Sequence, residues 1–272
     1  LRKARILVAE DLKTNQVIIT EMLQLLGHEV EIAENGRVAI AKYLSGDFSF
    51  IFMDCQMPIM DGYEATKKIR AIELKRNDVS VPIIALTAAS DKENRDRCTT
   101  AGMNGYLTKP FSLSNIQRSI ESHLKAPFLD QPGLNPADVS GSQTPKKNAD
   151  DSIELKIVNL KAIENIRDLE RQTGKLLLPS IFSGYVAQME EKLTELRGDI
   201  LHAEGTQIYR TAHAIRSMST NVGAERVSII SSQIEKKSKA NEFIGLTEAA
   251  VELTKAYQDF IEEFDSNVLK TS

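Results

Sequence analysis

The chain of 272 residues has no tryptophan, two cysteines and no excess of positive charge. Two cysteines cannot form a disulfide framework, so we expect Cys55 and Cys98 to be buried thiols in a reducing compartment. The formal net charge of -4 argues against a nucleic-acid-binding surface. No apolar run approaches the roughly 20 residues that a membrane-spanning helix needs. We therefore predict a cytoplasmic protein that binds no nucleic acid and does not itself insert into a membrane.

Apolar runs alternate with amphipathic stretches over residues 1–125, which we assign to a first domain. The expected strands are the runs 4–9, 48–53, 81–86 and 105–107. The expected helices are 15–26, 38–44, 63–73, 92–101 and 113–124. Strand followed by helix, repeated five times, predicts an α/β domain with a doubly wound, five-stranded parallel sheet.

Polar residues follow these apolar runs. They are Glu10 and Asp11, Asp54, Thr87 and Lys109. Because parallel strands end at the same edge of a sheet, we expect these side chains to meet. Clustered carboxylates suit Mg²⁺, and a lysine with a hydroxyl suits a transferring phosphoryl group. The cluster predicts an aspartyl phosphate, with Asp54 as the nucleophile.

Each of these residues also has an ordinary interpretation. An aspartate after a strand is usually a helix cap or a turn former. Glu10 and Asp11 could simply favour the positive end of a helix dipole. Thr87 and Lys109 could be ordinary residues of a strand end and of the surface. Their occurrence together, at four strand ends of one sheet, favours the site.

The pattern changes after residue 125. Residues 126–151 hold four of the eight prolines of the chain and predict a mobile linker. From about residue 152 helical spacing replaces strand signals, and the second half is acidic. Helices are expected around 160–169, over 177–196 with Gly198 as the end, and over 205–222, 226–240 and 246–264. Short connections between them predict an antiparallel bundle over 152–272.

The helix expected over 205–222 holds a second chemical signal. Its predicted core residues are Ile208, Ala212, Ile215, Ser219 and Val222. This spacing places Tyr209, His213 and Arg216 on the outward stripe, so we expect an exposed imidazole beside a cation. Gly223 is expected to end the helix. An exposed histidine is usually only a solvated residue, and the surrounding sequence decides between the two interpretations.

Residues 4–124 resemble a response-regulator receiver domain, which has a flavodoxin-like fold. The matching positions are the acidic pair Glu10 and Asp11, the phosphoacceptor Asp54, the switch residues Thr87 and Tyr106, the pair Lys109-Pro110, and the loop residues Met57, Pro58, Asp61 and Gly62. The resemblance implies that Asp11, Asp54 and the backbone carbonyl of Gln56 hold Mg²⁺. It also implies that Glu10 acts through water and that the bond before Pro110 is cis.

The segment 209–224, YRTAHAIRSMSTNVGA, resembles the signature of histidine phosphotransfer (HPt) domains. The resemblance implies that His213 is a phosphoacceptor on a four-helix bundle, here with an extra N-terminal helix. Arg216 stands where lysine is usual, and Ser217 where glycine is usual. Arg216 keeps a cation for the phosphoryl group, and Ser217 is small enough for a partner to approach. His28, His123 and His202 match no family position and are expected at the surface.

A receiver followed by an HPt domain resembles the C-terminal part of a tripartite hybrid sensor histidine kinase. The resemblance implies that Asp54 receives phosphate from the transmitter domain of a histidine kinase. Asp54 then passes it to His213, which donates it to the receiver of a downstream response regulator. The chain would be a phosphotransferase fragment without an ATP-binding domain. Because it begins at Leu1-Arg2-Lys3, we expect a longer protein, which other segments could anchor in the inner membrane.

Three alternatives belong to other classes. In the first, the receiver is a phosphorylation-dependent binding switch that uses Thr87 and Tyr106, and the bundle is a docking module. The second is a DNA-binding regulator, which the acidic balance and the lack of a basic recognition helix disfavour. The third is a phosphatase with an aspartyl intermediate, which the order of the motifs disfavours.

Overall fold

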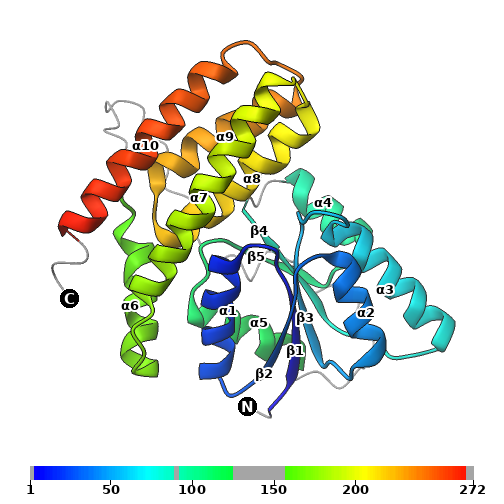
Figure 1. Ribbon diagram of the computed structural model, residues 1–272. Helices are drawn as coiled ribbons and strands as arrows, with labels where there is room; N and C mark the ends of the chain where they lie inside the picture. Colours follow the sequence, from blue (N-terminus) through cyan, green and yellow to red (C-terminus); the bar gives the residue numbers. More distant parts are fainter. Residues whose placement is uncertain (1–2, 89–91, 125–156, 268–272) are drawn as a thin grey trace.

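The computed structural model describes residues 3–88, 92–124 and 157–267. Its first part is a parallel sheet of five strands in the order β2-β1-β3-β4-β5, the topology of the flavodoxin-like fold (Figure 1). The strands are β1 (Arg5–Ala9), β2 (Glu29–Ala33), β3 (Phe50–Asp54), β4 (Ile83–Thr87) and β5 (Gly105–Thr108). The predicted doubly wound α/β domain is confirmed. The predicted linker, 126–151, lies outside the described residues.

Helices cover both faces of this sheet. They are α1 (Lys13–Leu25), α2 (Gly36–Ser45), α3 (Gly62–Arg76), α4 (Lys92–Ala101) and α5 (Leu113–Leu124). Side chains alternate along each strand, so neighbouring residues belong to different cores. Phe50 and Phe52 pack with α1 and α5, whereas Ile51 and Met53 pack with α2, α3 and α4. Burial on both faces explains why the central strands are continuous apolar runs.

The strand β2 was not located from the sequence, because no apolar run marks it. It lies at an edge of the sheet, and its residues Glu29 and Glu31 alternate with apolar ones. The Glu31 carboxylate accepts a hydrogen bond from the Arg5 guanidinium at 2.9 Å. Charged side chains on an edge strand hinder its pairing with another chain. The sequence signal was weak because this strand is only half-buried.

The second part of the structure is helical. It consists of α6 (Leu160–Thr173), α7 (Leu178–Leu201), α8 (Gly205–Val222), α9 (Glu225–Lys239) and α10 (Leu246–Asn267). α7 and α9 each contact both α8 and α10, which closes a four-helix bundle. The prediction that Gly198 ends a helix is wrong, because α7 continues to Leu201. One glycine inside a long packed helix costs only about 1 kcal/mol.

The predicted core face of α8 is confirmed. Its five members are buried: Ile208, Ala212, Ile215, Ser219 and Val222. Gly223 ends the helix with a φ of 82°, in the left-handed region that favours glycine. A Cβ atom there would lie 2.7 Å from the Asn159 carbonyl oxygen, so glycine is also required for space.

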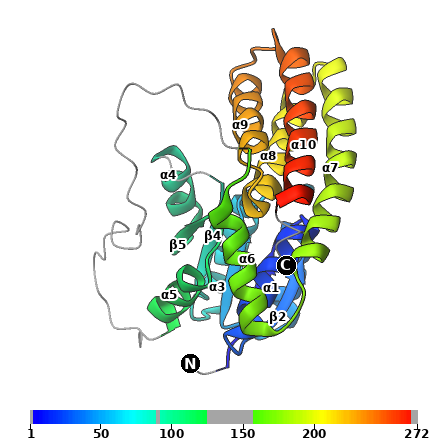
Figure 2. The ribbon, with the colours of Figure 1, turned by 90° about the vertical axis from the view of Figure 1, so that its left-hand side faces the viewer.

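The two parts pack together through α1. This helix contacts α6, α7 and α8, and the views in Figures 1 and 2 agree on that arrangement. The apolar residues between the sheet and α1 form one continuous cluster with the core of the bundle. The helical region therefore lies over the side of the first part that bears α1.

Two further expectations concern buried side chains. Cys55 and Cys98 are free and buried, as predicted. The expectation that His28 lies at the surface is wrong, because His28 is only 4% exposed. The Ala4 backbone N–H donates a hydrogen bond to its Nδ1 at 3.3 Å.

Candidate functional site

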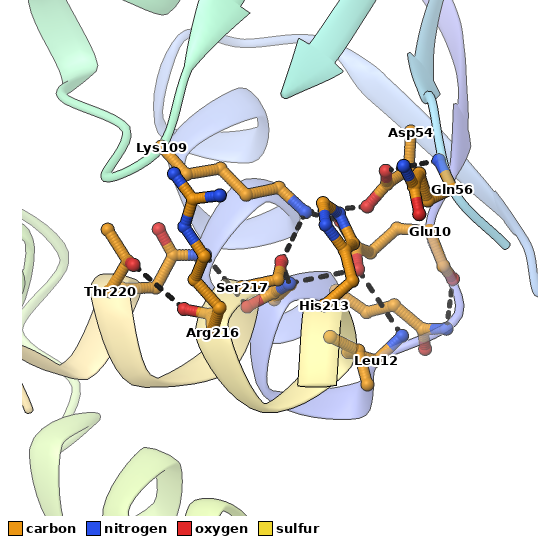
Figure 3. Close-up of polar contacts among 12 residues, drawn as sticks. Glu10, Leu12, Asp54, Gln56, Lys109, His213, Arg216, Ser217 and Thr220 are labelled. Carbon is orange, nitrogen blue, oxygen red and sulfur yellow. Dashed lines mark hydrogen bonds and ion pairs between the residues drawn. The ribbon is translucent and has the colours of Figure 1, made fainter. Parts of the chain in front are cut away.

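Charged side chains meet where three strands end. Glu10 directly follows β1, Asp54 is the last residue of β3, and Lys109 directly follows β5. All three are buried. The Lys109 Nζ atom donates to Glu10 Oε2 at 2.9 Å and to Asp54 Oδ2 at 2.6 Å (Figure 3). The parallel sheet thus brings together residues that are far apart in the sequence.

Glu10, Asp11 and Asp54 form an acidic cluster, with carboxylate oxygens within 4.8 Å of one another. Burial raises the pKa of Glu10 well above its ordinary value and that of Asp11 to about 6. Burial would also raise the pKa of Asp54, but Lys109 and His213 outweigh it and lower that pKa. A hard cation with oxygen ligands relieves such repulsion, and two carboxylates beside an open cavity suit Mg²⁺.

The loop after β3 shapes the site. The Gln56 backbone N–H donates to Asp54 Oδ1 at 2.9 Å, and Asp61 caps α3 by accepting from the Glu64 N–H at 2.8 Å. A Cβ atom on Gly62 would lie 2.0 Å from the Asp54 carbonyl oxygen, so this close approach requires glycine. The Lys109-Pro110 bond is cis, as the resemblance implied.

The predicted switch residues Thr87 and Tyr106 lie in β4 and β5. Thr87 ends β4 and is buried, and its carbonyl oxygen accepts from the Lys109 N–H at 2.9 Å. Tyr106 is half-buried in β5. Neither belongs to the residues that line the cavity described next. Their roles as switch residues stay predictions.

One cavity of about 630 Å³ is lined by Asp11, Asp54 and Gln56 of the first part and by Tyr209 and His213 of α8. His213 points from α8 toward the acidic cluster (Figure 3). Its side chain is only 12% exposed, because the first part of the molecule covers the outward stripe of α8. The expectation of an exposed imidazole is wrong for this arrangement. Beside it, Gln56 Nε2 donates to the Tyr209 hydroxyl at 2.5 Å.

Glu235 of α9 is a site residue that sequence reasoning missed. Its Oε1 atom lies 3.4 Å from His213 Nδ1, and its Oε2 atom accepts from the Arg216 guanidinium at 2.9 Å. Burial would raise the Glu235 pKa, but His213 and Arg216 outweigh it and lower that pKa. The available signal was a glutamate directly after the apolar position Ile234, at the margin of the core face of α9.

Arg216 and Ser217 both contact the first part of the molecule. The Arg216 guanidinium also donates to the Ala88 carbonyl oxygen at 2.9 Å. Lys109 donates to Ser217 Oγ at 2.7 Å, which makes Ser217 its third partner after Glu10 and Asp54. The sequence analysis expected the small side chain of Ser217 to let a partner approach, but it did not predict this hydrogen bond.

Among the helices of the described residues, none is both long and apolar enough to span a membrane.

Residues 6–121 match the family model of the response regulator receiver domain. The chain is 35% identical over 150 residues to probable histidine kinase 1 of Oryza sativa subsp. indica, covering 45% of this chain and 16% of that protein. It is 39% identical over 115 residues to hybrid signal transduction histidine kinase E of Dictyostelium discoideum, covering 42% and 7%. The chain thus spans a small part of these relatives.

Among solved structures, the chain is similar to the receiver domain of sensor histidine kinase PA1611 from Pseudomonas aeruginosa PAO1. The two are 40% identical with a TM-score of 0.42, and the match covers 46% of this chain and 99% of that one. That structure has a magnesium ion coordinated in the active site cleft.

Proposed function

Since residues 6–121 are a response regulator receiver domain, homologous to those of hybrid histidine kinases and followed by a helical region, we propose that the chain is a two-step phosphorelay module. Asp54 accepts a phosphoryl group and passes it to His213. The observation that carries this proposal is the cavity that Asp54 and His213 share. In this proposal the receiver spans residues 1–125, a linker 126–151, and an HPt domain 152–272.

The donor set at the acidic cluster fits magnesium. Asp11 and Asp54 would supply carboxylate oxygens, Gln56 its backbone carbonyl, and Glu10 a contact through water. A bound Mg²⁺ would neutralise the oxygens of the phosphoryl group. Glu10 already forms an ion pair with Lys109 at 2.9 Å. This pairing is consistent with a contact to Mg²⁺ through water and not by direct coordination.

The first step forms a bond between an Asp54 carboxylate oxygen and phosphorus while the phosphorus–nitrogen bond of a kinase phosphohistidine breaks. The lowered pKa of Asp54 keeps this nucleophile ionised. Lys109 lies 2.6 Å from the carboxylate and can neutralise charge on the phosphoryl oxygens.

The second step moves the phosphoryl group to His213. A ring nitrogen attacks phosphorus, the bond from phosphorus to the Asp54 oxygen breaks, and the carboxylate is restored. Glu235 lies on the Nδ1 side of the ring, which leaves Nε2 for the attack. Arg216 lies one turn farther along α8 and can offset the charge of the phosphohistidine. Both phosphoryl compounds are activated, so the step can run in either direction.

The proposed partners follow from these steps. A histidine kinase transmitter domain would deliver the phosphoryl group to Asp54, and the receiver of a downstream response regulator would accept it from His213. We place both exchanges in the cytoplasm, where a kinase has access to ATP. The site would catalyse transfer only, without ATP as a direct donor.

Labelling by a small acyl phosphate tests the order of the steps. The full chain would be incubated with Mg²⁺ and labelled acetyl phosphate as wild type, Asp54→Asn and His213→Gln. Phosphohistidine survives alkali and an acyl phosphate does not, so alkali separates the two labels. We expect both labels in wild type, only the alkali-labile label in His213→Gln, and neither in Asp54→Asn. An alkali-stable label in Asp54→Asn would contradict the proposed order.

The contact of α1 with α6, α7 and α8 favours a second candidate, in which the helical region is a docking module for the receiver. In that case His213→Gln would leave signalling to a downstream regulator intact. In the relay it would abolish signalling. The same variant therefore separates the two functions.

A further inference from the structure

Two polar residues of α8 are buried outside the bundle core. Ser217 and Asn221 follow His213 at intervals of four residues, so all three lie on one stripe of the helix. Ser217 is 1% exposed and Asn221 is 3% exposed, because the receiver covers them. Neither residue has a part in the two transfer steps.

The receiver residue that meets this stripe is Asn15, near the start of α1. Asn221 Nδ2 donates to Asn15 Oδ1 at 2.7 Å, and Asn15 Nδ2 donates to Ser217 Oγ at 3.1 Å. The same Asn15 amide donates to Glu10 Oε1 at 2.9 Å, and Asn15 is 0% exposed. A buried chain of hydrogen bonds thus joins α8 to the acidic cluster.

The neighbouring residue Thr14 makes a second polar contact. Gln188 Oε1 of α7 accepts from both the backbone N–H of Thr14, at 3.1 Å, and its hydroxyl, at 2.7 Å. The start of α1 therefore presents a hydroxyl and an amide side by side. The side chains of the helical region that contact this pair are two amides and one hydroxyl: Gln188, Asn221 and Ser217.

We propose that Gln188, Ser217 and Asn221 form a recognition surface for receivers whose first helix begins with a hydroxyl–amide pair like Thr14-Asn15. A buried polar group without a partner is costly, so an apolar residue in place of Asn15 would leave the Asn221 amide N–H without its acceptor. It would also remove one of the two partners of Ser217 Oγ, the other being Lys109. The inference rests on the proposed function, in which the surface around His213 meets two receivers in turn. The downstream receiver should therefore carry serine or threonine followed by asparagine at the same place.

Three variants of the full chain test the contact: Asn15→Leu, Asn221→Leu and the double variant. Gln24→Leu is the control, because it also replaces an amide side chain by leucine, at an exposed position of α1. Labelling by acetyl phosphate with Mg²⁺ reports the rate at Asp54 and the rate of transfer to His213 in one experiment.

Each single variant should slow transfer to His213 roughly tenfold. Asn221→Leu lies outside the receiver and should leave the rate at Asp54 unchanged, as should Gln24→Leu. The double variant should lose far less than the product of the single losses, because both partners become apolar together. Transfer at the wild-type rate in Asn221→Leu, or losses that multiply, would overturn the inference. Failure of wild type to label His213 would instead refute the proposed function.

A second arm tests the choice of downstream partner. Full chains with equally labelled His213, as wild type and Asn221→Leu, would be mixed with receiver proteins that have or lack asparagine at the Asn15 position. We expect Asn221→Leu to slow transfer roughly tenfold to receivers with asparagine and to leave transfer to the others unchanged. An equal effect on both groups would overturn the inference.

Discussion

The two proposed phosphoacceptor sites of this molecule are built in different ways. The site around Asp54 is assembled from the ends of β1, β3 and β5, so its parts are separated by tens of residues in the sequence. The site around His213 needs one helix, α8, and one residue from its neighbour α9. The receiver site therefore depends on the whole sheet, whereas the histidine depends on a local helical stripe. This difference predicts how each site fails.

The largest effect is expected at Lys109, where three partners meet. Lys109→Met keeps much of the side-chain volume but leaves the buried carboxylates of Glu10 and Asp54 without their cation. Removing one partner of a buried ion pair costs about 3–5 kcal/mol. We expect unfolding of the receiver at lower denaturant concentration and a fall of roughly 100-fold or more in the labelling of Asp54.

The control for Lys109→Met is Lys67→Met, at an exposed position of α3. This variant should unfold and label as wild type does. If Lys109→Met labelled Asp54 at the rate of Lys67→Met, the site would not depend on the charge that the sheet brings to it.

The next effect is expected at Glu235 and should be confined to the histidine site. Glu235→Leu removes the carboxylate that contacts His213 Nδ1 and Arg216. We expect transfer to His213 to slow roughly tenfold, because the ring loses its orienting partner and Arg216 loses its carboxylate, keeping only the Ala88 carbonyl oxygen as an acceptor. Acetyl phosphate labelling would measure this rate together with that at Asp54.

Glu235 is a positioning residue, so the rate at Asp54 should not change in Glu235→Leu. Glu235→Gln keeps a side-chain oxygen beside His213 Nδ1 and should recover part of the lost rate. Glu242→Leu, at an exposed position, serves as the matched control. An equal loss at Asp54 and His213 would show that the two sites do not fail separately.

The same difference explains what could be predicted from the sequence. Asp54 and Lys109 were found because they follow apolar runs, and parallel topology brings such positions together. Helical periodicity separated the core face of α8 from its outward face, but His213 was singled out by the resemblance of the segment 209–224 to the HPt signature. Glu235 and Asn15 carried no such signal, because their importance comes from the packing of α9 on α8 and of α1 on α8.

The strand β2 and the exposure of His213 show the same limit. Burial depends on what lies across from a residue, and this information is not local. An edge strand such as β2 is only half-buried, so its sequence contains charged residues and is not a continuous apolar run. His213 lies on the outward stripe of α8 as predicted, but the receiver covers that stripe.

Smaller effects on stability are expected at the glycines that end helices in the two regions. Gly27 follows α1 with a φ of 85° and Gly223 follows α8 with a φ of 82°. Alanine in the left-handed region costs about 1–2 kcal/mol at either position. A Cβ atom at Gly27 would meet nothing within 4 Å, whereas one at Gly223 would lie 2.7 Å from the Asn159 carbonyl oxygen.

Gly223→Ala should therefore destabilise the protein more than Gly27→Ala does. We expect the larger cost to appear in the helical region, because Asn159 caps α6 and would have to move. Denaturant unfolding, followed by hydrogen exchange in each region, would measure both costs. Equal losses of stability in the two variants would mean that the segment before α6 can move away from the added methyl group without a free-energy cost.

The smallest effect concerns acid and His28. Burial lowers the pKa of His28 from its ordinary value of 6.5, so the folded receiver binds less proton there than the unfolded chain does. The stability that neutral His28 contributes is present above pH 6.5 and is lost as the pH falls from 6.5 toward its folded pKa. His28→Gln does not titrate, so its stability relative to wild type should rise over that interval. Denaturant unfolding at a series of pH values measures this difference, and parallel curves for wild type and His28→Gln would contradict the assignment.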